Sequence, residues 1–369
     1  MNRLDLNIIL FSAISLIGCN GSGEEILPTP TNQDKLPIVW QVQSKSVMES
    51  KALINDNMAL QDACTPTGGK SIGIWGSYEE DAYGLVLTFL EFDAVPLTYG
   101  AKTEDTTNPY NTYWNYPGKN KLWEPGARYT FRACFPLNFV LDNKFEINPK
   151  IVQGMVATST MQTDLLAASA YVEATGENMG QPVQLQMKHM LSGLKFSVQA
   201  KSGYTPDNEE KVNSCWLENK GDDGSRFSTS GYLVYSGVVD SESIKWTKSS
   251  SNSNKMYYWK HKNGISIPLS TAEASALYVN DSDETTPGDI YCNNENWLLI
   301  IPQKNDGSLH FGYTLSNAEG LEFKVPIPAI TYEPGKLYNY VLEISGADAQ
   351  ITLTIADWNQ LDSSHNIVL

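Results

Sequence analysis

Apolar and polar residues alternate along most of this chain, so that every second side chain falls on the same face. A period of two is typical of strands with one buried face. Strands of this kind are predicted over residues 129–135, 309–315, 321–327 and 351–355. Pro-Gly pairs, which favour turns, stand at 117–118, 125–126, 287–288 and 334–335. The pattern predicts an all-β fold built as β-sandwiches.

Three local signals refine this prediction. Asn305–Gly307 separates two strand patterns and predicts a hairpin turn. Thr163–Tyr171 is rich in Leu and Ala and is the best candidate for a short helix, although it has little amphipathic length. In Val183–Val198 the alternation changes phase around His189–Gly193, which predicts a bulge or a crossing between sheets.

One sequence device occurs twice. Residues 123–131 and 332–340 share an aromatic residue, then Glu-Pro-Gly, then a Tyr and a second aromatic residue. Two copies so far apart predict two similar sandwiches in tandem, with the polar stretch Glu173–Gln181 as the linker. The expected parts are a signal peptide at 1–18, a tether at 19–36, and β-sandwich domains at 37–180 and 181–369.

The N-terminus has the features of a lipoprotein export signal. Arg3 precedes an apolar stretch, Ile8–Ile17, that is too short to cross about 30 Å of hydrocarbon as a helix. The stretch ends in Leu-Ile-Gly-Cys19, which resembles the bacterial lipobox, where the thiol is acylated and the chain is cut before it. The alternative is an ordinary secretory peptide that happens to end in Cys. Glu24 and Glu25 in the tether resemble a signal that places lipoproteins on the outer face of the outer membrane.

The charge of the chain restricts its partners. Acidic residues exceed basic ones by 42 to 26, which gives a net charge of −16 that is not gathered in one tail. Nucleic acids and anionic membrane surfaces need clustered Lys and Arg. We therefore expect no nucleic-acid partner.

No arrangement of residues predicts catalysis, a metal or a cofactor. The four histidines include no pair at metal-ligand spacing, and His189 has the phase of a core residue. Thr65–Ser71 is similar to a phosphate-binding loop but has Cys64 where glycine is needed, so we interpret it as a turn. The oxygen-rich segment Asn280–Asp289 lacks the spacing of a calcium loop and is interpreted as a solvated loop. We expect a protein that is not an enzyme.

Four cysteines remain besides Cys19. They are Cys64, Cys134, Cys215 and Cys292. Export permits disulfides, so one disulfide in each domain and four free buried thiols both remain open.

The chain resembles the fimbrillin family, the precursors of type V pili of anaerobic Gram-negative bacteria. The segments that carry the resemblance are Ile72–Gly76, Trp123–Phe135, Asp164–Leu166, Val183–Val198, Tyr332–Ile344 and Ile355–Trp358. The resemblance implies two transthyretin-like sandwiches, export as a lipoprotein to the outer membrane, and a surface-exposed fimbrium. It also implies removal of the first strand and head-to-tail assembly with other pilus subunits by donor-strand exchange. The first strand after the tether is predicted at Pro37–Gln43, where Ile38, Trp40 and Val42 alternate as they would against a core.

The resemblance also implies a processing site. The family's best-known proteases cut after arginine, yet no Arg occurs between Arg3 and Arg128. Lys51-Ala52 stands where the family's Arg-Ala cut usually falls, and we favour Lys51 over Lys45 as the processed residue. The donor would be the C-terminus, with Ile351–Ile355 and the uncharged end of the chain.

The role expected from the sequence is a structural and adhesive pilus subunit that touches a host or bacterial surface ligand. The alternative is a surface lipoprotein that stays anchored in the outer membrane, as a pilus base or a glycan-binding module.

Lipidation at Cys19 is directly testable, because only a thiol forms the thioether bond. In the producing cell, Cys19→Ala should abolish palmitate labelling and leave an uncleaved or soluble precursor. Labelling that is unchanged in the Cys19→Ala variant would refute the assignment.

Overall fold

The protein is nearly all β. The computed structural model describes residues 35–44, 57–82, 84–100, 113–137, 152–154, 164–206, 210–219, 231–236, 243–248, 255–260, 267–268, 274–276, 278–280, 298–318, 320–346, 348–357 and 365–367. Leu36–Leu369 is one compact unit. In the described part the only helix is α1 (Asn57–Ala63), and none is long and apolar enough to cross a membrane. The predicted all-β class is confirmed.

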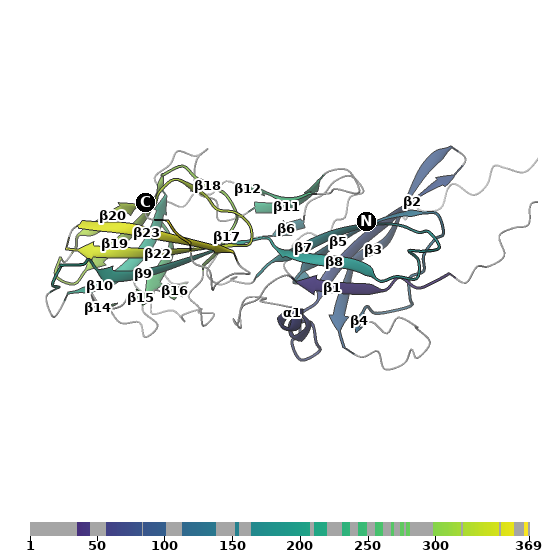
Figure 1. Ribbon diagram of the computed structural model, residues 1–369, viewed down its shortest axis with the longest axis horizontal. Coiled ribbons are helices and arrows are strands. Elements are labelled where there is room, and N and C mark those ends of the chain that lie inside the picture. The colour runs from purple at the N-terminus through teal and green to yellow at the C-terminus, as the bar shows by residue number, and fades with distance from the viewer. Residues whose placement is uncertain are drawn as a thin grey trace, which may run out of the picture. The chain divides into compact units, whose positions relative to one another are not determined.

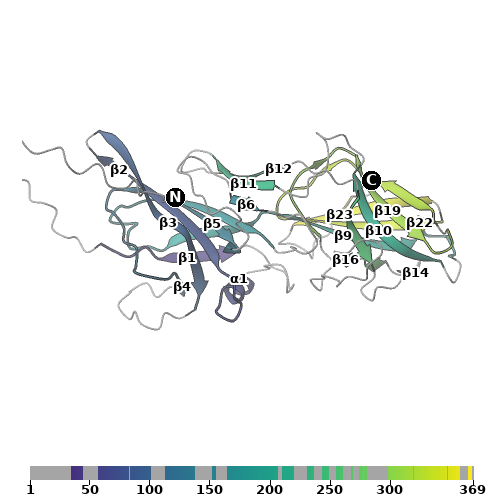
Figure 2. The same cartoon turned by 180° about the vertical axis from the view of Figure 1, so that it is seen from behind.

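Seven strands form the N-terminal sheet in the order β1-β8-β7-β5-β2-β3-β4 (Figure 1). They are β1 (Trp40–Ser44), β2 (Ile72–Ala82), β3 (Leu85–Tyr99), β4 (Trp114–Asn115), β5 (Arg128–Phe135), β7 (Leu166–Glu173) and β8 (Val183–His189). Neighbours are antiparallel except β1 and β8, which are parallel. The two ends of the sheet, β1 and β4, contact each other beside α1, so the sheet curls around its own core (Figure 2).

Two six-stranded sheets follow. One has the order β16-β13-β10-β19-β20, with β14 added to β10, and the other has the order β15-β9-β22-β23-β24, with β17 added to β9. The first contains β10 (Lys211–Asn219), β13 (Lys255–Lys260), β14 (Ile267–Pro268), β16 (Tyr278–Asn280), β19 (Leu309–Leu315) and β20 (Glu322–Pro326). The second contains β9 (Ser192–Ala200), β15 (Ser275–Ala276), β17 (Leu298–Ile300), β22 (Lys336–Ser345), β23 (Asp348–Asp357) and β24 (His365–Ile367).

The inner faces of these two sheets share one core. Phe196 of β9 stacks on Phe311 of β19 and on Tyr340 of β22, with ring centroids 4.9 Å apart in both pairs. Shorter strands form two small sheets, β12-β11-β6 and β18-β21. Their bounds are β6 (Val152–Gly154), β11 (Gly231–Ser236), β12 (Ser243–Lys248), β18 (Lys304–Asn305) and β21 (Ile330–Thr331).

Most predicted strands are confirmed, but two local predictions are wrong. Thr163–Tyr171 is not a helix, because residues 166–173 form β7 between β5 and β8. The helix propensity of Leu and Ala is overridden there by pairing on both sides. Asn305–Gly307 does form a turn, in which Asn305 Oδ1 accepts the Gly307 amide at 3.1 Å. It is not a hairpin turn, because β18 pairs with β21 while β19 pairs with β10 and β20.

The predicted crossing between sheets is confirmed. β8 belongs to the N-terminal sheet and β9, which begins three residues after β8 ends, belongs to a C-terminal sheet. The Glu173–Gln181 stretch joins β7 to β8 within one sheet, so the chain leaves that sheet only after His189. His189 is buried, and its Nδ1 lies 3.0 Å from a carboxylate oxygen of Asp164.

The described cysteines are free thiols. Cys64, Cys134 and Cys215 are all buried and form no disulfide, so the pairing of one disulfide per domain is wrong for these three. Burial raises the pKa of Cys64 and of Cys134 to about 12, because a buried thiolate loses its hydration. Cys292 lies outside the described residues.

The repeated sequence device folds the same way in both places. In each copy the first aromatic ring lies edge-on to the Tyr ring, with centroids 4.7 Å apart for Trp123–Tyr129 and 4.8 Å apart for Tyr332–Tyr338. Each Tyr hydroxyl accepts the amide of the Glu in its own device at 2.8 Å. The Gly after each Pro has a positive φ, 83° for Gly126 and 72° for Gly335, as position i+2 of a type II turn requires. Each copy therefore fixes the turn that begins a central strand, β5 or β22.

Removing one hydroxyl from this device should weaken the fold measurably. Tyr129→Phe and Tyr338→Phe keep both rings and leave a part-buried amide without its acceptor, so each should lower the free energy of unfolding by about 1 kcal/mol. Tyr113→Phe, at a side chain that is 54% exposed, is the matched control and should change little. Urea unfolding measures all three, and equal effects at the three positions would contradict the assigned role.

Candidate functional site: the seat of the first strand

The first strand supplies part of the core of the N-terminal sheet. The side chains of Ile38, Trp40 and Val42 are buried and belong to its hydrophobic cluster, while Gln41 points to solvent. The Trp40 ring lies edge-on to Phe92 at 5.4 Å and to Phe131 at 5.0 Å between centroids. We call the surface that receives residues 36–44 the β1 seat.

Backbone hydrogen bonds hold β1 along its length. Trp40–Ser44 pair in parallel with Val183–Met187 of β8, and the Val183 amide donates to the Val39 carbonyl at 2.8 Å. On the solvent side, the side-chain amide of Gln184 donates to Gln41 at 3.0 Å and that of Gln186 donates to Gln43 at 3.4 Å. The seat therefore binds the main chain of an extended segment, and it buries every second side chain of that segment while the others face solvent.

Residues 121–123 form hydrogen bonds with the residues that precede β1. The Ile38 amide donates to the Lys121 carbonyl at 2.8 Å, and the Trp123 amide donates to the Leu36 carbonyl at 3.0 Å. Lys121 in turn lies 3.4 Å from a carboxylate oxygen of Glu91 on β3. The entrance thus brings together the start of β1, residues 121–123 and the outer part of the sheet.

The seat selects by shape and apolarity. Among the described residues, no acceptor lies within hydrogen-bond distance of the buried indole N–H of Trp40. An unsatisfied buried donor gives nothing to stability, so an apolar residue without an N–H can take this position and no hydrogen bond is broken. β1 is also the last strand on its side of the sheet, so an incoming segment has to remake the β8 ladder and the two backbone hydrogen bonds with residues 121 and 123.

The far end of β1 leads directly into the predicted cleavage segment. The Ser44 amide donates to the side-chain carbonyl of Asn57 at the start of α1, so the two ends of residues 45–56 are held together. Lys45 and Lys51 lie within that segment, which is outside the described residues. Cys19 also lies outside the described residues, nearer the N-terminus. The structure therefore places none of the three predicted modification sites, but it fixes both ends of the segment that contains two of them.

Part of the predicted donor segment, Ile351–Ile355, is already paired within a sheet of its own chain. Ile351 and Leu353 of β23 are buried, and β23 pairs with β22 from Asp348 to Asp357. β24 pairs with β23 over three residues only, His365–Ile367. Residues 358–364 and 368–369 lie outside the described residues.

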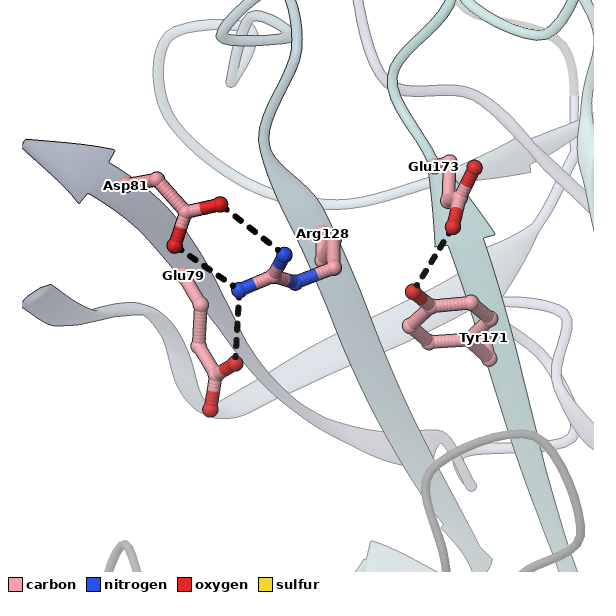
Figure 3. Close-up of polar contacts among 5 residues, drawn as sticks. All are labelled: Glu79, Asp81, Arg128, Tyr171 and Glu173. Carbon is pink, nitrogen blue, oxygen red and sulfur yellow. Dashed lines mark hydrogen bonds and ion pairs between the residues drawn. The ribbon is translucent and has the colours of Figure 1, made fainter. Parts of the chain in front are cut away.

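A polar cluster lies on the outer face of the same sheet (Figure 3). Arg128 donates two hydrogen bonds to Asp81, at 3.1 and 3.2 Å, and lies 3.6 Å from Glu79. These contacts with Asp81 raise the pKa of the Arg128 guanidinium. The Tyr171 hydroxyl donates to Glu173 at 3.2 Å, and both residues line an open groove of about 500 Å³ at the turn from β7 to β8.

None of these arrangements resembles a catalytic centre. The part of the chain that the structure describes has no group of three or more His, Cys, Asp or Glu placed to hold a metal ion. His189 and Asp164 form a pair inside the core, as expected for a core histidine. Thr65–Lys70 follows α1 as a turn, in which the Thr65 hydroxyl accepts the Gly68 amide at 3.1 Å.

Comparison with known proteins points to one family. The model of a family described as fimbrillin-like matches residues 67–358. No functionally curated protein matches the sequence. A fimbrial protein from Bacteroides vulgatus is similar in structure, with a TM-score of 0.51 and 15% identity over 88% of this chain and 99% of that one. A candidate cell adhesion protein from Bacteroides uniformis has a TM-score of 0.48 and 14% identity over 89% of this chain and 100% of that one.

Sequence reasoning found β1 but missed the strand that receives it. The alternation of Ile38, Trp40 and Val42 signals a half-buried strand, whereas nothing local signals parallel pairing with β8, more than one hundred residues later. The partner strand has the same alternation, and that shared pattern is the only clue that the sequence offers.

The seat should respond very differently to changes on the two faces of β1. Trp40→Ala removes a fully buried ring and should lower the free energy of unfolding by about 3–5 kcal/mol. Gln41→Ala, on the solvent face of the same strand, should cost about 0.5 kcal/mol. Urea unfolding of the intact chain measures both, and similar values for the two variants would show that β1 contributes no core.

Proposed function

Because this chain belongs to the fimbrillin-like family, and is therefore a pilus or adhesion subunit of the cell surface, we propose that it assembles by replacing its own first strand. In this proposal Cys19 is lipidated, and the precursor is held on the outer membrane. A protease then cuts within residues 45–56, and another copy donates a strand to the β1 seat.

The observation that carries the proposal is the way in which β1 is held. β1 is a buried edge strand that fills the core through Ile38, Trp40 and Val42. Among the described residues, the contacts that keep it in place are non-covalent. One cut in that segment therefore turns an internal strand into a bound peptide that can be exchanged. A cut after Lys51 is favoured over one after Lys45, and it would release residues 19–51.

Removal of β1 would leave a site suited to another strand. The outer edge of β8 would present unpaired backbone groups over Val183–Met187, beside an apolar trough lined by Phe92 and Phe131. Unpaired strand edges next to apolar pockets bind extended segments by β-augmentation. Head-to-tail donation of this kind gives an open filament and not a closed ring.

The donor is assigned to the end of the chain after β23. Ile351–Ile355 is part of a fully paired strand of its own sheet, and withdrawing it would expose the C-terminal core. Of residues 358–369 the structure describes only β24, which pairs with β23 over three residues. Twelve residues span at most about 40 Å when extended, which is enough to fill a seat of nine residues.

We also propose a border between the two halves of the chain after β8. The N-terminal domain in this proposal includes β8, which receives the first strand, and ends at the crossing between β8 and β9. The expected border at 180 would separate β8 from the sheet that it completes.

A surface ligand is a second element of the proposal. The groove at the turn from β7 to β8 presents the Tyr171 ring together with Glu173 and Asn178, a combination suited to sugar hydroxyls. If the chain stays anchored as a pilus base or a glycan-binding module, this groove is the binding site we assign to it.

In either role the protein has no catalytic activity. Glycosidase, protease and esterase screens should show no turnover, and an activity abolished by a substitution at His189 would overturn this.

Three forms of the chain test strand exchange. The intact chain should form no filaments, the chain that begins at Ala52 should form filaments, and the latter without Asn359–Leu369 should form none. Size-exclusion chromatography and electron microscopy measure the outcome. A chain beginning at Ala52 that stays monomeric and stable for days, or filaments that still form without the last residues, would rule out the exchange.

A peptide makes the test specific for the seat. Added in excess, a peptide of residues 36–44 should return to the β1 seat and block filament growth of the chain that begins at Ala52. The same peptide with Trp40→Ser, which keeps the backbone but lacks the buried ring, should block much less. Equal inhibition by the two peptides would mean that the seat does not recognise β1.

A further inference from the structure

The β2–β3 hairpin carries an unusual amount of exposed apolar surface. Among the described residues nine large apolar side chains are exposed, and five of them lie in the first six residues of β3. These five are Leu85, Val86, Leu87, Phe89 and Leu90. Single exposed apolar residues are ordinary, whereas a contiguous strip of them marks an interaction surface. We call residues 85–90 the β3 strip.

The β3 strip is also a strand edge. On one side β3 pairs with β2 along its length, up to the Ala82–Leu85 pair on either side of the turn (Figure 1). On its other side, in the part of the chain that the structure describes, β3 is paired only at Thr98 and Tyr99, by β4. Apolar side chains and an unpaired backbone edge therefore occur on the same six residues, which is the usual condition for pairing with another strand.

The hairpin is held in shape before any partner arrives. Tyr78 of β2 stacks on Phe89 of the strip and on Tyr129 of β5, with ring centroids 5.0 Å apart in both cases. On the opposite face, the two hydrogen bonds from Arg128 to Asp81 fix β2 to β5 (Figure 3). A strand that is already ordered loses little freedom on binding.

The charges around the strip indicate what can cover it. Residues 85–90 carry no charge, but Glu79, Glu80 and Asp81 lie on the paired strand and Glu91 follows the strip. Acidic neighbours disfavour an anionic membrane surface. A second copy of the strip, running antiparallel about a two-fold axis through Thr88, would pair Leu87 with Phe89 and Val86 with Leu90. In that register Glu91 faces Leu85, so no two acidic residues oppose each other.

We propose that the β3 strips of two copies pair edge to edge and join the chains side by side. The contact is isologous, because the same six residues serve both partners. A strip of six residues is small beside the roughly 800 Å² per partner of a standard stable interface, so two free chains pair weakly. Pairing becomes effective where many copies are arrayed on one surface or filament. It needs no cleavage and no strand donation, so it stands or falls separately from the proposed assembly.

Sedimentation of the intact chain with β1 in place, over a range of concentrations, tests the pairing. The wild-type chain should dimerise weakly, and Leu87→Lys should lower the association constant about tenfold or more by placing two like charges beside the two-fold axis. Leu321→Lys is the matched control, since Leu321 is 58% exposed and Leu87 is 41% exposed. The control should associate like the wild type.

A charge exchange tests the register. In the proposed pairing residue 88 faces residue 88 of the other copy, so Thr88→Lys and Thr88→Glu should each weaken self-association, and an equimolar mixture of the two variants should associate. Hydrogen exchange should slow across residues 85–90 as the concentration of the wild-type chain rises, and should not slow in Leu87→Lys.

Four results would overturn the proposal. They are a wild-type chain that stays monomeric at every concentration, equal weakening of association in Leu87→Lys and Leu321→Lys, no association in the mixture of the two Thr88 variants, and full protection of residues 85–90 already at high dilution. The last result would show that the chain covers its own strip. Binding of the wild type to vesicles of phosphatidylethanolamine and phosphatidylglycerol, abolished in Leu87→Lys and without self-association, would assign the strip to a membrane and reject the proposal.

Discussion

The buried face of the N-terminal sheet is closed by a strand from the beginning of the chain. β1 reaches its place only by pairing in parallel with β8, whose residues lie more than one hundred positions later. The two strands are not neighbours in the sequence. β1 is held by its hydrogen bonds to β8, by its contacts with residues 121–123 and by the packing of the Trp40 ring. The N-terminal core is therefore complete only while an extended apolar segment occupies this position.

This dependence explains why an edge strand can be both part of the core and replaceable. An internal strand has two ladders, and its removal would divide the sheet. β1 has one ladder, to β8. The buried Trp40 ring packs against its neighbours, and its indole N–H has no hydrogen-bond acceptor among the described residues. The turn formed by Glu124–Ala127 begins β5, and the equivalent turn at 333–336 begins β22, so a rigid scaffold surrounds the exchangeable element. Rigid surroundings favour a seat that keeps its form when its occupant changes.

The strands were predictable where alternation is local, and the pairing was not. Tyr129–Phe135 and Leu309–Leu315 have one buried and one polar face, which the period of two reveals directly. The segment Leu166–Glu173 resembles a helix because Leu and Ala favour helices, and only its two neighbouring strands decide otherwise. The polar stretch Glu173–Gln181 resembles a linker and is a turn between paired strands. For the site, the sequence identified β1 and the lysines beyond it, but not the strand that receives it.

The most direct test of this account is the N-terminal sequence of the chains present in assembled filaments. The account predicts chains that begin at Ala52, or in any case after Ser44, so that Trp40 is absent and another segment fills the β1 seat. Filament chains that begin at Cys19, or that retain residues 36–44 covalently joined to the rest, would contradict strand replacement.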